Sequence, residues 1–354
     1  MRKYIIIITV VGFILLAKQT VCQDPVLENL RSANPVITSK EINASIVNLQ
    51  DPNINEDKKA LNAQLLFIAA AKGKEFDKSE ISIIIEISEK TDKATIHEWL
   101  VKVLWKIAEH RSTNNLTPIE LNEIRISMVK NIKENRSGLL WAIYALTELG
   151  GDKRIEDNLT KIIFEKPQKQ TVDIQTSAAR CLGIMKSQKA VKPLCSALYG
   201  FYANPDPVLK EREMFIESSI EIGELYKTSY INALVMINAN VVAEVRPWLR
   251  NDNPKVRYLG AVVLGRLGEN SAVPLLVESL QNNRDIYERI RAAEILGELG
   301  DKKAIAPLLQ VKRDIDKQNC YNEEILIKVL EQNNFKSVIE QSLNKIDKQN
   351  KATE

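Results

Sequence analysis

Two histidines, His97 and His110, are the side chains of this sequence best suited to bind a transition metal or move a proton near neutral pH. His97 is followed by Glu98, but one His-Glu pair supplies too few ligands for a metal site. The sequence contains no H-E-x-x-H, G-x-G-x-x-G, P-loop or G-x-S-x-G motif. We therefore expect no catalytic residue, no metal ion and no cofactor, and we predict that the chain is not an enzyme.

The cysteines Cys181 and Cys195 are the next residues with possible chemistry. No pair of cysteines has the C-x-x-C spacing of a metal site. Cys181 and Cys195 stand where a later, similar part of the sequence has Val263 and Leu276. We interpret them as small apolar core residues. A Cys181–Cys195 disulfide is the alternative if the compartment is oxidising.

The N-terminal residues predict export. A basic start is followed by an apolar run over residues 5–17, which is shorter than the about 20 residues that span a bilayer. We predict a signal peptide at residues 1–22, cleaved between Cys22 and Gln23, and a periplasmic or secreted protein. An uncleaved anchor or a lipidated Cys22 are the alternatives, and only these would attach the chain to a membrane, facing outside the cytoplasm. A composition rich in Ile, Lys and Asn favours a bacterial source.

The charge balance argues against a nucleic-acid partner. The chain has 49 Lys and Arg against 46 Asp and Glu, a net charge of +3. Arg2, Lys3 and Lys18 of the predicted signal peptide account for this excess, so the remaining chain is neutral. A nucleic-acid-binding protein usually has a basic excess or a basic stripe.

One pattern recurs along the chain. VRYLGAVVLGRLGENSAVPLL, from Val256, returns as ERIRAAEILGELGDKKAIAPLL, from Glu288. Each copy has small residues, then Leu-Gly-x-Leu-Gly and an acid, then Ala and a Leu pair, and weaker copies recur every 30 to 45 residues or so. The pattern predicts a first helix that ends at Gly268 or Gly300 in a left-handed conformation, followed by a second helix with one apolar face.

These residues resemble HEAT repeats of the short kind found in phycobilin lyases, most clearly over residues 170–314. The resemblance implies an all-α fold, an α–α superhelix or HEAT-like solenoid, and a protein-binding habit. It also implies that Asp252 pairs with Arg257, and Asp285 with Arg289, while Gln175 replaces the Arg in an earlier repeat. The predicted domains are an N-terminal cap segment at 23–57, a solenoid of about seven to eight two-helix units at 58–347 and a polar tail at 348–354.

The aromatic residues divide into two groups. Trp99, Trp105 and Trp141 lie on first helices among apolar residues, and we interpret them as packing residues, with a ligand platform as the alternative. A second group lies where the repeats become irregular, and it makes the better interface, because aromatic residues are enriched at binding hot spots. This group consists of Tyr199, Phe201, Tyr202 and Trp248.

We predict an exported, non-catalytic scaffold or adaptor that binds a protein or peptide through the concave face of the solenoid. The second-helix residues that lie off the apolar stripe are expected to face that side. An accessory subunit of an enzyme that attaches a cofactor or chromophore, or a structural lipoprotein of the cell envelope, is the alternative. The predicted second-helix binding residues are Lys192, Ser196, Tyr199, Glu278, Gln281, Gln310 and Arg313.

Overall fold

The computed structural model of the chain describes residues 37–112, 114–164, 172–203, 218–283, 285–318 and 326–353. All regular secondary structure in these ranges is helical, and no helix there is long and apolar enough to cross a membrane. The chain forms two compact units, Met1–Ala145 (unit 1) and Leu146–Glu354 (unit 2), which are described separately. The predicted signal peptide, including Cys22 and Gln23, lies outside the described residues.

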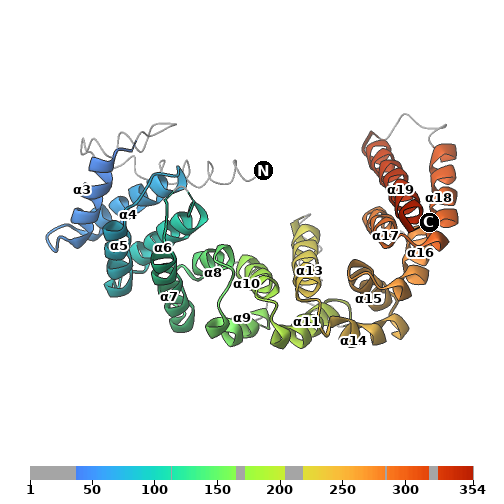
Figure 1. Ribbon diagram of the computed structural model, residues 1–354, viewed down its shortest axis with the longest axis horizontal. Coiled ribbons are helices and arrows are strands. Elements are labelled where there is room, and N and C mark those ends of the chain that lie inside the picture. Colours follow the sequence, from blue (N-terminus) through green and yellow to red (C-terminus); the bar gives the residue numbers. More distant parts are fainter. Residues whose placement is uncertain are drawn as a thin grey trace. The chain divides into compact units, whose positions relative to one another are not determined.

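Unit 1 consists of helices in two layers (Figure 1). Helix α4 packs against α6 in one layer, and α3 packs against α5 and α5 against α7 in the other. Helices α3, α5 and α7 begin with capping boxes, in which Thr38, Asp77 or Thr117 and a Glu three residues later satisfy free N–H groups. The helices are α3 (Ser39–Gln50), α4 (Glu56–Ala71), α5 (Lys78–Lys90), α6 (Ala94–Glu109), α7 (Pro118–Glu134) and α8 (Leu139–Glu148), whose last residues belong to unit 2.

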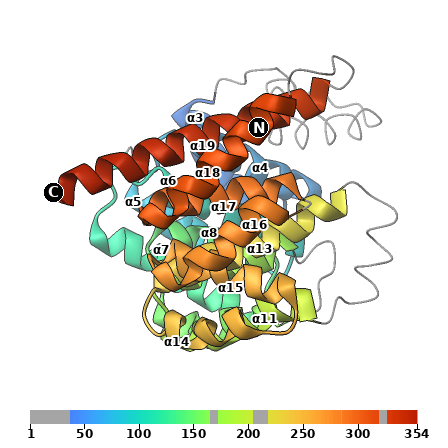
Figure 2. The ribbon, with the colours of Figure 1, turned by 90° about the vertical axis from the view of Figure 1, so that its right-hand side faces the viewer.

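Unit 2 repeats the same two layers (Figures 1 and 2). Its first-helix layer is α10 (Val172–Ile184), α13 (Ser218–Ile237), α15 (Pro254–Arg266), α17 (Ile286–Leu299) and α19 (Leu326–Thr353). Its second-helix layer is α9 (Glu156–Ile163), α11 (Val191–Ala203), α14 (Val241–Val245), α16 (Val273–Asn282) and α18 (Ile305–Gln318). Short 3-10 turns lead into or extend second helices, namely η2 (Lys153–Ile155), η3 (Gln188–Ala190), η4 (Arg246–Arg250), η5 (Asn270–Ala272) and η6 (Lys302–Ala304).

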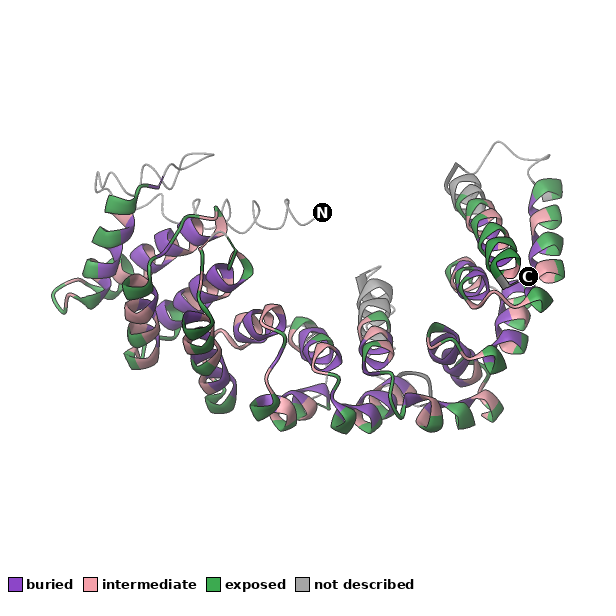
Figure 3. Ribbon diagram, viewed as in Figure 1, coloured by how far each residue is buried: buried purple, intermediate pink, exposed green. Residues whose placement is uncertain are grey.

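The buried residues lie between the two layers (Figure 3). Each helix turns an apolar stripe toward its neighbours and its polar residues toward solvent, as the helical period requires. The stripe predicted for α16 is largely borne out, since Val273, Leu276 and Leu280 are buried and Val277 is half-buried. An α–α stack without one central core follows, because each pair of helices buries its apolar faces against the next pair.

Glycines bring neighbouring first helices close together in unit 2. A Cβ on Gly183 would lie 2.9 Å from Cα of Ala233, and one on Gly297 would lie 2.6 Å from Cα of Ser342. These contacts join α10 to α13 and α17 to α19. The first-helix layer follows the inner side of the bend of unit 2 in Figure 1, and α11, α14 and α16 follow its outer side. The expectation that second helices face the concave side is therefore corrected, because close approach in one layer bends the stack toward that layer.

The predicted left-handed helix ends are confirmed. Gly268 has φ of 84° and Gly300 has φ of 70°, a region that costs glycine little. Lys186 holds the equivalent place after α10 and has φ of 52°. The same turn geometry is thus kept where the sequence lacks the glycine.

A single side-chain position ties consecutive helix pairs together. The fourth residue of four different first helices donates a hydrogen bond to a main-chain carbonyl at the end of the preceding second helix. Carbonyls in the last turn of a helix lack helical partners, so each bond satisfies a group that would otherwise need solvent. The bonds run from His97 Nδ1 to Ser88 O (2.7 Å), Gln175 Nε2 to Ile162 O (3.1 Å), Arg257 Nη1 to Asn251 O (2.8 Å) and Arg289 Nε to Leu280 O (2.9 Å).

The hydrogen bonds made at this position correct two ion pairs that the family resemblance implied. Arg257 was expected to pair with the carboxylate of Asp252, yet its guanidinium donates to main-chain carbonyls, including that of Asp252 at 3.0 Å. Asp285 does not pair with Arg289 either, since its carboxylate accepts from the first N–H groups of α17. Gln175 replaces the Arg in sequence and keeps its role, because an amide N–H also reaches a carbonyl.

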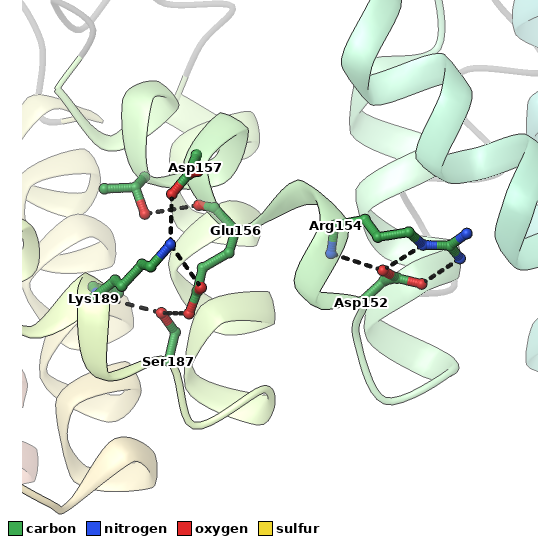
Figure 4. A network of polar contacts seen from close by, with 8 residues as sticks. Asp152, Arg154, Glu156, Asp157, Ser187 and Lys189 are labelled. Atoms are coloured by element: carbon green, nitrogen blue, oxygen red, sulfur yellow. Dashed lines mark hydrogen bonds and ion pairs between the residues drawn. The ribbon is translucent and has the colours of Figure 1, made fainter.

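A polar network joins the start of α9 to the start of η3 (Figure 4). Ser187 Oγ donates to Glu156, and Lys189 Nζ lies 3.7 Å from Glu156 and 3.3 Å from Asp157. Asp152 accepts from the main chain and guanidinium of Arg154 at the preceding turn. These groups cap turns at exposed helix ends, so we assign the network a structural role.

Both ends of the predicted solenoid can be compared with the structure. Helix α3 lies within the segment 23–57 that was expected to cap the solenoid. Over the polar tail predicted at 348–354, α19 continues to Thr353 and its residues are largely exposed. Ile346 of this helix is buried, so its apolar face still packs near the end of the chain.

Cys181 and Cys195 are free, buried thiols, so the disulfide alternative is not formed in the structure. Burial raises the pKa of the Cys181 thiol to about 11 and that of the Cys195 thiol to about 12. A thiol with a raised pKa is a poor nucleophile at neutral pH. Both side chains therefore act as small apolar residues of the core.

Candidate protein-binding surface

The second-helix residues predicted to bind a partner are distributed over three helices. All except Tyr199 are exposed, and they make few contacts with one another. Arg313 Nη2 donates to Gln310 Oε1 at 3.0 Å, and Gln310 donates to Asp314. Lys192 and Ser196 lie on α11, Glu278 and Gln281 on α16, and Gln310 and Arg313 on α18.

The aromatic residues favoured as an interface are packed against each other instead. Trp248 is 9% exposed and its ring lies 5.9 Å from that of Tyr199. The Tyr199 hydroxyl accepts a bond from Asn251 Nδ2 at 3.2 Å. This pair fills the joint between α11 and η4. The enclosure of Trp248 corrects the expectation that its ring serves a partner, whereas Tyr199 is half-buried and stays a prediction. Phe201 and Tyr202 fall in the last turn of α11, and their side chains lie outside the described ones.

Unit 1 carries five half-buried aromatic residues on its first-helix layer, which we call the aromatic row. They come from three consecutive first helices, α4, α6 and α8. Ring centroids lie 5.4 Å apart for Phe67 and Trp99, 4.9 Å for Trp105 and Trp141, and 5.8 Å for Trp141 and Tyr144. Separations of this size are typical of favourable aromatic pairs. Trp99, Trp105 and Trp141 were interpreted as packing residues, and the structure leaves each of them partly open to solvent.

A lysine connects the two halves of the aromatic row. Lys102 Nζ lies 4.1 Å from the ring centroid of Trp99 and 5.0 Å from that of Trp141. Glu98 Oε1 is 2.8 Å from the same nitrogen, and it also accepts from the Trp141 indole N–H at 3.4 Å. An ammonium group between two indole rings is attracted by both ring faces. The side chains of the row are therefore held in place before any partner binds.

The charges within the aromatic row cancel. Lys106 Nζ lies 3.9 Å from the Trp105 ring centroid and pairs with Glu109. Lys102 pairs with Glu98 in the same way. Two lysines and two glutamates leave the row without net charge. A polyanion such as nucleic acid would gain no net electrostatic attraction here.

Polar groups at the edges of the row remain available. Within the described part of the chain, the indole N–H groups of Trp99 and Trp105 and the hydroxyl of Tyr144 have no hydrogen-bond partner. The one buried, unpartnered side-chain atom among the described residues is Asn131 Oδ1, so these three groups reach solvent. The row thus combines apolar ring surface with hydrogen-bonding groups, as protein interfaces commonly do.

Sequence reasoning missed this surface for an identifiable reason. The exposed face of α6 includes Glu98 and Lys102, and Trp99 and Trp105 lie at its two edges. Tryptophans at the edge of a polar face resemble the flank of an apolar stripe in sequence. Neighbouring residue types gave no usable signal, because the buried Trp248 lies between Arg246 and Arg250 whereas the half-buried Trp141 lies among apolar residues.

The buried His97 has no role in this surface. Its Nδ1–H donates to Ser88 O, and its Nε2 accepts from Asn131 Nδ2 at 2.6 Å. Burial lowers the pKa of His97, which keeps the imidazole neutral. In the described residues no group of three or more His, Cys, Asp or Glu side chains could hold a metal ion.

Three solved structures are similar to this chain over most of its length. The complex of CpcE and CpcF of phycocyanin lyase from Nostoc is 17% identical, with 92% of this chain and 99% of that chain covered and a TM-score of 0.31. Human deoxyhypusine hydroxylase is 15% identical, with 87% and 96% covered and a TM-score of 0.29. An engineered protein is 14% identical, with 87% and 99% covered and a TM-score of 0.27. Comparison with curated proteins gives no match.

The prediction that the chain is not an enzyme is corrected by these neighbours. Two of the three carry the names of enzymes, a hydroxylase and a lyase. A helical stack of this kind therefore gives no ground for excluding catalysis.

The family comparison agrees with the repeat pattern. The family model of HEAT repeats matches residues 242–318, which include α15 to α18 and the second half of the region where the resemblance was clearest. The resemblance predicted from the sequence is confirmed by this match to the HEAT-repeat model over residues 242–318.

Proposed function

We propose that this chain is an adaptor that binds another protein, and that the aromatic row of unit 1 is its binding surface. The observation that carries the proposal is the partial exposure of five aromatic side chains on neighbouring helices. Tryptophan and tyrosine dominate binding hot spots because each buries a large area with little loss of conformational freedom. HEAT repeats support the proposal, since stacked helices present extended binding surfaces.

The second-helix residues provide a competing surface, which stays a prediction. Crosslinking and capture from the envelope fraction would compare the wild-type chain with two variants. One variant combines Trp99→Ala and Trp105→Ala, and the other combines Lys192→Glu and Arg313→Glu. Loss of a captured protein in the first variant alone supports the aromatic row. Loss in the second variant alone would move the binding surface to α11 and α18, and capture unchanged in both would contradict the proposal.

We also propose that the protein acts outside the cytoplasm, as a periplasmic or secreted protein. The basic start and the apolar run at residues 5–17 support this. Intact mass of the protein from its source cells provides the test. A chain that begins at Gln23 is expected. A chain that retains Cys22 with an added lipid would instead indicate an envelope lipoprotein, and an uncleaved chain found in the cytoplasm would contradict export.

A further inference from the structure

We infer that the aromatic row binds a proline-rich, extended protein segment. The inference rests on the proposed function and specifies the chemistry of the partner. It draws on three features of the row, which are its open ring surface, its free donors and its neutral charge.

The ring surface fits proline. The side chains of Phe67, Trp99, Trp105, Trp141 and Tyr144 are each part exposed and come from three consecutive helices. Proline-rich segments bind aromatic-lined surfaces, because their pre-formed extended helix loses little entropy on binding. A row of rings that is already fixed by Lys102 and by ring contacts adds little ordering cost on the other side.

The free donors fit the backbone of such a segment. A polyproline II helix makes no internal hydrogen bonds, so its carbonyl groups need outside donors. Trp99 and Trp105 offer indole N–H groups that have no partner in the described part of the chain, and the Tyr144 hydroxyl is a third. A helix or strand from a partner would bring carbonyls that are already bonded, so it would use these donors less well.

The neutral charge of the aromatic row also suits a proline-rich segment. Glu98 and Glu109 neutralise Lys102 and Lys106 within the row. A strongly acidic or strongly basic segment would therefore meet one repelling charge for every attracting one. Proline-rich segments depend on ring contacts and carbonyls, so a neutral surface imposes no such penalty.

The test is calorimetric titration of the purified chain with an oligoproline peptide of about ten residues. A Gly-Ser peptide of the same length is the control ligand. We expect oligoproline to bind and the Gly-Ser peptide not to bind. Trp105→Ala should weaken oligoproline binding by about tenfold or more, as for a hot-spot residue. Trp105→Phe should weaken it by about threefold or more, because the ring remains and the N–H group is lost.

A matched control removes an exposed aromatic side chain elsewhere. Phe164 is 58% exposed at the end of α9 in unit 2, so Phe164→Ala should leave oligoproline binding unchanged. Circular dichroism and the melting temperature would show that each variant is folded. If Trp105→Ala lowers the melting temperature strongly, Trp105→Phe still tests binding at the row, because it keeps a smaller aromatic ring and removes the N–H donor.

Four results would overturn the inference. Oligoproline could fail to bind, or could bind equally to wild type and both Trp105 variants. In either of these cases, the variant that combines Trp99→Ala and Trp105→Ala could still lose the captured protein. The adaptor function would then stand, and only the proline-rich partner would be rejected. Binding of a soluble oligosaccharide that is lost in Trp105→Ala would make the row a carbohydrate platform. Self-association that is lost in Trp105→Ala would make a second copy of the chain the occupant.

Discussion

Unit 1 and unit 2 share one architecture but use large and small residues in opposite ways. In unit 2, glycines at helix contacts, such as Gly183 and Gly297, bring helices together, and Trp248 is packed in a joint. In unit 1, rings such as Trp99 and Trp105 stay partly exposed on the same layer. The regular Leu-Gly-x-Leu-Gly pattern therefore marks tight packing. The surface best suited to a partner lies where that pattern is weakest.

The sharpest test of this difference compares two neighbouring residues of α6. Leu104 is fully buried, so Leu104→Ala should lower the free energy of unfolding by about 2–5 kcal/mol. Trp105 is half-buried, so Trp105→Ala should cost less than the about 3–5 kcal/mol expected for a fully buried tryptophan. Urea unfolding of both variants checks the prediction. A cost of about 3–5 kcal/mol or more for Trp105→Ala would mean that the row belongs to the core.

A second test concerns the glycine contacts of unit 2. Gly297→Val should lower the stability by about 3 kcal/mol, because its Cβ would meet the backbone of Ser342, which cannot move aside cheaply. The control is Gly200 of α11, around which a Cβ would find open space. Gly200→Ala should raise the stability by about 0.5–1 kcal/mol. A mild effect of Gly297→Val in thermal unfolding would contradict the close approach of α17 and α19.

A third test addresses the side chain that links helix pairs. Arg257→Leu should cost about 1.5 kcal/mol, because two main-chain carbonyls lose a charged donor. Asp252→Asn should have almost no effect, since Arg257 contacts the carbonyl and not the carboxylate of Asp252. Chemical denaturation of the two variants separates these partners. A large cost for Asp252→Asn would restore the ion pair that the family resemblance implied.

The smallest expected effect is a pH dependence confined to unit 1. Burial lowers the pKa of His97 below its unfolded value of 6.5, so the unfolded chain binds the proton more tightly. The stability that neutral His97 contributes is present above about pH 6.5 and is lost as the pH falls below it. Arg136 disfavours and Glu134 favours the charged imidazole, and burial outweighs both.

His97→Gln tests this dependence by copying the residue that unit 2 uses at the same position, Gln175. The melting temperature of the wild type should fall more than that of His97→Gln between about pH 7.5 and about pH 5. His110→Gln provides the control, because His110 is a partly exposed histidine that follows the opposite, C-terminal end of the same helix. Equal pH dependence in the wild type and in His97→Gln would show that folding leaves the pKa of His97 unchanged.

The fold could be predicted from the sequence because the repeat pattern reflects how the helices pack. Small residues, helix-ending glycines such as Gly300 and the apolar stripe of α16 follow directly from helix geometry. The position of Gln175 shows the limit of this reasoning. A replaced arginine looked like a broken ion-pair ladder, but the acceptor is a main-chain carbonyl, which leaves no trace in the identity of any residue.

The candidate site was harder to predict because exposure depends on how neighbouring helices pack. Trp141 and Trp248 are the same residue type, but Trp141 lies among apolar residues in sequence whereas Trp248 has an arginine two residues away on each side. Trp248 is enclosed where η4 meets α15, whereas Trp141 stacks beside Trp105 at the edge of a polar face. The helical period predicts the direction in which a side chain leaves its own helix. It does not predict whether a neighbouring helix covers that side chain.

The linking position described above also bears on how such a chain can diverge. His97, Gln175, Arg257 and Arg289 each act as the donor, and the acceptor is always a main-chain carbonyl. Every residue has that carbonyl, so the acceptor side of the joint survives substitution. Adjacent helix pairs can then accumulate substitutions independently, because a change in one pair needs no matching change in the next. In an alignment of relatives, these joints should show little covariation, and whole helix pairs should be gained or lost with the neighbouring joints intact.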